Sequence, residues 1–237
     1  MERLSNQTKK QQKTDWTTVI SISIIGLMFF IFGFVSWVNS ILIPYFKIAC
    51  ELTNLQSYLV AFAFYIAYFF MSVPASLLLE KVGFKKGMML GFFVMATGAF
   101  LFIPAALSRA YPIFLGGLFL IGTGLALLQT AANPYITIVG PIDRAAQRIS
   151  IMGICNKVAG IIAPLVFAAV VLKVSDNELF KTLDSGLLSA SEKDVLLNEL
   201  IRRVIFPYSI LGTLLLLVGL LVRYSPLPEI NTEKSNK

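Results

Sequence analysis

The sequence predicts an all-α membrane protein with six transmembrane helices, on the basis of composition, run length and charge pattern. Of its 237 residues, 57% are hydrophobic and only 14% are charged, whereas soluble domains carry about 25% charged residues. The apolar residues gather in six runs near the length of about 20 residues that crosses a bilayer. Basic residues concentrate in alternate segments between these runs. A water-soluble globular protein is therefore excluded.

The expected bundle occupies residues 18–224 and follows a cytoplasmic tail at residues 1–17. The first apolar run is longer than a signal-peptide core and has no small-residue cleavage site, so it is expected to be a retained helix. The fourth run could break at Asn133-Pro134. In chain order the spans are expected at Thr18–Phe46, Leu55–Leu79, Gly87–Leu107, Tyr111–Val139, Ala145–Leu172 and Val204–Val222.

Two segments are expected outside the membrane after the fifth span. The loop at residues 173–203 contains Ser189 followed three residues later by Glu192, the pattern of a capping box, and then apolar residues at helical spacing. We expect a short amphipathic helix there, on the outer surface. Residues 225–237 form a polar cytoplasmic tail, or the start of a linker.

The basic residues predict the orientation. Only Lys47 and Arg109 lie in the two short outer loops. With both termini in the cytoplasm, the inner segments carry twelve basic residues: Arg3, Lys9, Lys10, Lys13, Lys81, Lys85, Lys86, Arg144, Arg148, Arg223, Lys234 and Lys237. The positive-inside rule therefore predicts a multi-pass protein of the cell (inner or plasma) membrane with cytoplasmic termini. The net charge of +7 is a topology signal and does not indicate a nucleic-acid partner.

Enzyme chemistry is not expected. The chain has no histidine, which excludes Ser-His-Asp and Cys-His catalysis. Its two cysteines, Cys50 and Cys155, are too far apart for a CxxC motif. No acid lies deep in a span, so no metal or other cofactor site is expected.

Polar residues inside the spans are the candidate ligands, because each must pair or line a wet cavity. Lys157 is the one ionisable side chain deep in a span, and a lysine there costs about 2.5–3.5 kcal/mol. Packing between helices is the alternative explanation for each amide. Amides, hydroxyls, aromatic rings and one ammonium favour a neutral polyhydroxylated ligand, a monosaccharide. The candidate substrate-binding residues are Asn39, Tyr65, Tyr68, Gln129, Asn133, Asn156 and Lys157.

Several motifs resemble those of one transporter family. The segment Ser76 to Lys86 is similar to the signature G-x-L-x-D-R-x-G-R-K of the major facilitator superfamily, in which it is a cytoplasmic hinge between helices. The motifs N-S-I-L-I-P from Asn39, F-Y-I-A-Y-F from Phe64, Q-T-A-A-N-P-Y from Gln129 and I-C-N-K ending at Lys157 resemble the fucose/galactose/glucose:cation symporters, closest to the glucose/galactose transporter branch. The hinge residues carried over are Ser76, Glu80, Lys81, Gly83 and Lys85.

The resemblance implies alternating-access transport of a hexose, but two features depart from the family. Proton-coupled fucose members carry acids where this chain has Ser40 and Gln129. Neutral oxygens of Asn39, Ser40 and Gln129 suggest Na⁺ as the coupling ion instead.

The second departure is length, because the resemblance covers only the N-terminal six-helix half, a 3+3 inverted repeat, of a twelve-span transporter. We expect a truncated or split gene product that works with a separately encoded C-terminal half, a monosaccharide and membrane lipid. The alternative is a non-transporting six-helix membrane protein.

Overall fold

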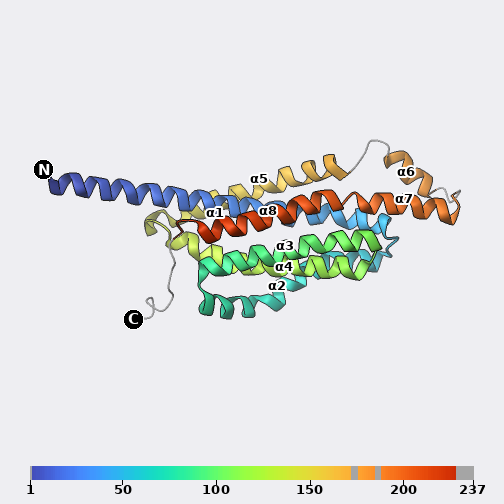
Figure 1. The fold of residues 1–237 in the computed structure, drawn as a ribbon, viewed down its shortest axis with the longest axis horizontal. Helices are drawn as coiled ribbons and strands as arrows, with labels where there is room; N and C mark the ends of the chain where they lie inside the picture. Colours follow the sequence, from blue (N-terminus) through green and yellow to red (C-terminus); the bar gives the residue numbers. More distant parts are fainter. Residues whose placement is uncertain (1, 172–175, 185–187, 228–237) are drawn as a thin grey trace.

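The computed structural model describes residues 2–171, 176–184 and 188–227, without the side chains of residues 2–15, 17, 39–41, 72, 176–178 and 184. In this part of the chain all regular structure is helical, and the long helices run side by side with α6 and α7 at one end (Figure 1). The elements are α1 (Glu2–Ala49), α2 (Asn54–Val82), α3 (Phe84–Ser108), α4 (Tyr111–Ile138), η1 (Ile142–Arg144), α5 (Ala145–Val171), α6 (Asp176–Asp184), α7 (Ala190–Arg202) and α8 (Ile205–Tyr224).

The prediction of an all-helical membrane protein is confirmed. Among the described residues, six helices are long and apolar enough to cross a membrane. Helix α1 begins at Glu2, so the segment expected as a tail continues the first helix. Helix α4 runs unbroken through Pro134, where we considered a break. A proline is tolerated inside a membrane helix when neighbouring groups satisfy the carbonyl that it frees.

Helix α7 is the amphipathic helix expected in the long loop, and it packs onto the end of the bundle. Ser189 and Glu192 form the expected capping box at its start. Leu200 is fully buried, and its carbonyl accepts a hydrogen bond from the Tyr45 hydroxyl of α1. α7 also forms ion pairs with the loops beneath it, Asp194 with Arg109 at 2.9 Å and Lys193 with Glu51 at 2.6 Å. Helix α7 is therefore fixed to the ends of the spans.

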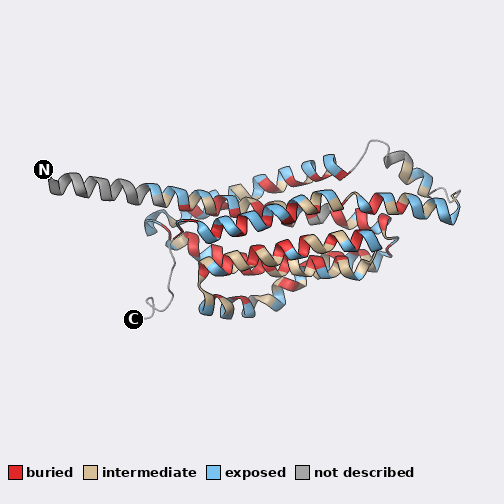
Figure 2. Ribbon diagram, in the orientation of Figure 1, coloured by how far each residue is buried: buried red, intermediate tan, exposed pale blue. Residues whose placement is uncertain are grey.

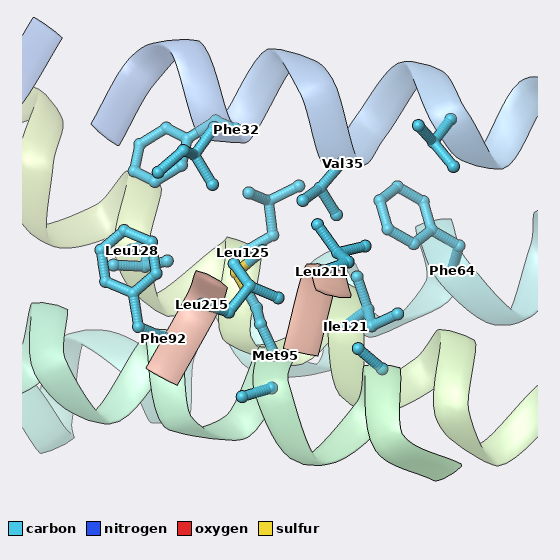
Figure 3. Packing of buried hydrophobic residues seen from close by; sticks show 14 of the residues in the cluster. Phe32, Val35, Phe64, Phe92, Met95, Ile121, Leu125, Leu128, Leu211 and Leu215 are labelled. Carbon is cyan, nitrogen blue, oxygen red and sulfur yellow. The ribbon is translucent and has the colours of Figure 1, made fainter. Parts of the chain in front are cut away.

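Helices α3 and α4 form the most buried part of the bundle. They approach closely at Gly98 and Gly117, where a methyl group on either glycine would lie 2.6 or 2.9 Å from the carbonyl oxygen of the other. Small residues permit this approach between membrane helices. Apolar side chains of α1, α3, α4 and α8 fill the core beside them, and the Phe32 and Phe92 rings lie 6.4 Å apart (Figure 3). This rigid core supports the helices that carry the candidate ligands.

Candidate functional site

Helix α1 holds α5 through direct backbone contact. Gly33 of α1 lies against the carbonyl group of Asn156, and a side chain at Gly33 would collide with it. One turn away, the Asn156 amide nitrogen donates a hydrogen bond to the Phe29 carbonyl oxygen at 3.2 Å. Asn156 is thus partly used in joining the two helices, as the packing explanation expects. Its neighbour Lys157 is carried on the same turn of α5.

The Lys157 ammonium lies over the Trp37 ring of α1, 5.8 Å from the ring centroid. Gly160 makes room for the indole, because a methyl group there would lie 2.6 Å from its Nε1 atom. Both Lys157 and Trp37 are exposed on the surface of this chain. A cation and an aromatic face together form a surface that can bind a sugar. Trp37 was missed from the sequence because a tryptophan in an apolar run is indistinguishable from a packing residue.

Tyr68 approaches the same turn of α1 from helix α2. Its hydroxyl lies near the side chain of Ser36, the neighbour of Trp37. The Phe64 ring packs edge-on against both predicted tyrosines. Its centroid lies 5.9 Å from that of the Tyr68 ring and 5.2 Å from that of the Tyr65 ring. Tyr65 itself is 64% exposed and points outward from the chain. Tyr68 and Lys157 therefore approach α1 at neighbouring residues, Ser36 and Trp37. Tyr65, in contrast, is exposed on α2.

Gln129 and Asn133 occupy helix α4. Gln129 is half-buried and Asn133 is exposed, one turn apart on one face. Figure 3 shows Leu128, the residue before Gln129, below Phe32 of α1. The two amides stay accessible although they belong to the most buried helix of the bundle.

The predicted residues Asn39 and Ser40 belong to α1, one turn beyond Ser36 and Trp37. Their side chains lie outside the described residues, so Gln129 is the one proposed cation ligand that the structure describes. The contacts that α1 makes with the other candidates run from Phe29 to Trp37, near the middle of the Thr18–Ala49 span. Of the described candidates, Tyr68, Asn156 and Lys157 reach α1 within this stretch. For reference we name the whole described set, together with Ser36 and Trp37, the α1 face: Tyr65, Tyr68, Gln129, Asn133, Asn156 and Lys157.

The predicted hinge motif forms the turn between α2 and α3. Gly83 ends α2 with a φ of 82° and ψ of 164°, a conformation that is essentially restricted to glycine. The Lys85 ammonium donates a hydrogen bond to the Ser225 carbonyl oxygen at the end of α8, at 2.6 Å. The remaining motif residues, Ser76, Glu80 and Lys81, are exposed. This turn thus connects the same end of three helices.

Arg148 has a structural role that the charge count did not predict. It is only 4% exposed, and its guanidinium donates hydrogen bonds to the carbonyl oxygens of Ile136, Thr137 and Pro141 at 2.8–3.0 Å. Two of these carbonyls belong to the last turn of α4, which has no intrahelical donor for them. Arg148 therefore fixes the end of α4 to the start of α5.

Comparisons with known proteins agree with this architecture. Residues 25–236 match the sequence profile described as the Major Facilitator Superfamily. The chain is 35% identical over 214 residues to a glucose/galactose transporter of Brucella abortus, covering 90% of this chain and 48% of the relative. It is 34% identical over 215 residues to the L-fucose-proton symporter of Escherichia coli, covering 91% of this chain and 49% of the relative.

A crystal structure of the transporter FucP in its outward conformation superimposes with a TM-score of 0.76 at 34% identity, covering 90% of this chain and 51% of that one. The chain thus spans about half the length of the curated relatives that it matches. These relatives are named as transporters and symporters. The fold of the described residues is that of one six-helix half.

Proposed function

The chain belongs to the Major Facilitator Superfamily, and we propose that it is the N-terminal half of a cation-coupled hexose transporter that works by alternating access. The observation that carries the proposal is the α1 face, where the Lys157 ammonium, the Trp37 indole, the Asn133 amide and the Tyr65 hydroxyl belong to exposed residues. This combination suits a sugar, which offers hydroxyl groups to the amides and apolar C–H faces to the aromatic rings. The names of the relatives support a hexose of the glucose, galactose or fucose type.

We propose that a second six-helix half covers the α1 face. Lys157 and Asn133 are exposed on this face, and lipid contact with a lysine at mid-depth would cost about 2.5–3.5 kcal/mol. Helix α2 also exposes a row of aromatic side chains, including Phe62, Tyr65 and Phe69. A protein partner with a water-filled cavity at its centre satisfies both features.

We also propose that both termini lie in the cytoplasm. The twelve basic residues of the inner segments support it. The hinge turn with Gly83 and Lys85 then lies on the cytoplasmic side, where the superfamily signature is expected, and α7 lies outside. A cysteine introduced by Ser191→Cys should react with a membrane-impermeant maleimide in intact cells, whereas one introduced by Asp143→Cys, at an exposed position of the proposed cytoplasmic side, should not.

We propose that the coupled cation is a proton and that its carboxylate lies outside this chain. The E. coli relative is named a proton symporter, which gives no support to the Na⁺ site suggested by Asn39, Ser40 and Gln129. The apolar spans of this chain hold no aspartate or glutamate to take up a proton. Hexose binding to this chain should therefore be unchanged by Na⁺ and by pH between about 5 and 8. Gln129→Glu should introduce a pH dependence, and Na⁺-dependent binding to the unsubstituted chain would contradict the proposal.

Equilibrium binding of radiolabelled glucose, galactose and fucose to the reconstituted chain tests the function. We expect saturable binding of a hexose without accumulation in liposomes, because half a cavity cannot alternate. Asn133→Ala should lower the affinity about tenfold or more, since it removes hydrogen bonds to a desolvated ligand. Gln147→Ala, an exposed amide at the start of α5, is the matched control. Binding that Asn133→Ala leaves unchanged would show that the site is misassigned.

The second candidate function is a six-helix membrane protein that does not transport. Absence of hexose binding in the same assay, with the chain inserted and folded, would support this alternative over the transporter half.

A further inference from the structure

An apolar groove of about 310 Å³ lies between helices α1, α5 and α8, away from the α1 face. Its floor is buried and includes Ile31 and Val38 of α1 and Phe167 of α5. Its walls are exposed side chains, such as Val170 of α5 and Phe206 of α8. Apolar cavities are poor sites for water and bind apolar molecules instead. The groove is therefore shaped for a hydrocarbon chain.

Helix geometry places the groove on the membrane side of α5. Val166, which lines it, stands nine positions after Lys157. At about 100° per residue, nine positions turn a side chain to the opposite side of the helix. Lys157 and Val166 therefore point to opposite sides of α5, so a partner that covers Lys157 leaves the Val166 side of the groove open to lipid.

The groove also marks a gap in helix packing. Helix α5 packs along α1 and makes only slight direct contact with α8. Unfilled space between helices forfeits dispersion contacts on both walls. An acyl chain in the groove would restore these contacts and hold α5 in place relative to α8.

An exposed basic residue, Arg202, ends α7 four positions before the groove residue Phe206. The adjacent Arg203 is already paired with Glu199 at 3.1 Å, so Arg202 is the arginine of this pair that remains available to an anion from the bilayer. Basic side chains at the membrane surface attract anionic lipid headgroups.

We propose that this groove binds one acyl chain of an anionic phospholipid, whose headgroup lies at Arg202 in the leaflet at the α7 end of the bundle. The hydrocarbon chain runs along α8 between Phe206 and Leu214, both of which line the groove. The lipid acts as a wedge between α5 and α8. This site is independent of the hexose site on the α1 face.

Native mass spectrometry of the chain released from nanodiscs of equal phosphatidylglycerol and phosphatidylcholine tests the site. We expect one retained phospholipid. Phosphatidylglycerol should be preferred about fivefold over phosphatidylcholine, because a single arginine attracts its anionic headgroup. Leu214→Trp fills the groove and should reduce the retained fraction strongly. Leu216→Trp, on the same helix but outside the groove, should not. No retained lipid, or equal retention by the two variants, would overturn the proposal.

Two further variants separate the hydrocarbon contact from the headgroup contact. Val170→Leu narrows the groove from the opposite wall with a smaller change, and it should lower retention even if Leu214→Trp does not fold. Arg202→Gln should keep the lipid but lose the preference for phosphatidylglycerol, whereas Arg223→Gln, at the other end of α8, should keep both. A preference unchanged in Arg202→Gln would contradict the assigned headgroup position.

Discussion

Helices α3 and α4 on one side, and α2 and α5 on the other, use similar sequences for different purposes. Half or more of the apolar span is buried in α3 and α4, 50% and 56%, but only 22% in α2 and in α5 (Figure 2). Close approach at glycines occurs in both regions, at Gly98 with Gly117 and at Gly33 with Asn156. Between α3 and α4, Gly98 packs against Gly117 within an apolar core. Between α1 and α5, Gly33 packs against the backbone of Asn156, which precedes the exposed Lys157.

The difference suggests a division of labour. The buried side of the α3–α4 pair stabilises the bundle, whereas the peripheral helices α2 and α5, with the accessible amides of α4, present the α1 face to a partner and a ligand. Substitutions in the buried α3–α4 core should therefore change stability, and substitutions on the α1 face should change binding. The following predictions test this separation, from the largest expected effect to the smallest.

Gly98→Val should cause the largest loss of stability. The added side chain would meet the Gly117 carbonyl and the Ile121 backbone nitrogen within 2.6–2.9 Å, and backbone cannot move aside cheaply. We expect a loss of about 3 kcal/mol, at the upper end of the usual cost of overpacking. Thermal unfolding in detergent measures it. Gly116→Val, where no heavy atom lies within 4 Å, is the control, and equal losses would refute the packing account.

Arg148→Met should destabilise the chain by about 2–3 kcal/mol. It leaves buried carbonyl oxygens without donors, and hydrogen bonds to a charged group contribute about 1.5–3 kcal/mol. The neighbouring Gln147→Met, at an exposed position, should have little effect in the same unfolding experiment. If the two variants unfold at the same temperature, Arg148 does not hold α4 to α5 as described.

Trp37→Leu should change binding much more than stability. The exposed contact with Lys157 contributes about 0.5–1 kcal/mol, so the unfolding temperature should move little. Hexose affinity should fall about tenfold if the indole stacks on the sugar. Phe93→Leu on α3 serves as the aromatic control away from the α1 face. A Trp37→Leu variant with lost stability and unchanged affinity would reverse the proposed roles of the two regions.

Acid should loosen the start of α7, a small effect outside both regions. The hydroxyl of Ser189 lowers the pKa of Glu192 through a hydrogen bond, which its backbone N–H reinforces. The carboxylate therefore stabilises the folded helix above its unfolded pKa of about 4.3, and this contribution is lost as pH falls through the lower folded value. The protection factor for amide hydrogen exchange, which is corrected for the intrinsic pH dependence of exchange, should fall in the first turn of α7 at acid pH. Ser189→Ala should remove that dependence, and a protection factor that still falls with acid in the variant would contradict the assignment.

Much of the fold was predictable from the sequence because membrane spans are defined by length and hydropathy. The capping box of Ser189 and Glu192 was also predictable, since it depends on residues three positions apart. Trp37 and Ser36 were not, because their roles depend on residues of α5 and α2 that only packing brings near. Arg148 was counted as a surface charge, because a charge count does not reveal that a guanidinium caps a neighbouring helix.

The most direct test of the central claim is the fluorescence of Trp37 during hexose titration. The chain has two tryptophans, so Trp16→Phe leaves Trp37 as the only indole. We predict a saturable change in its emission with glucose, galactose or fucose, which Asn133→Ala weakens in parallel with binding. Emission that none of these sugars alters, in a chain that is inserted and folded, would contradict a hexose site on the α1 face.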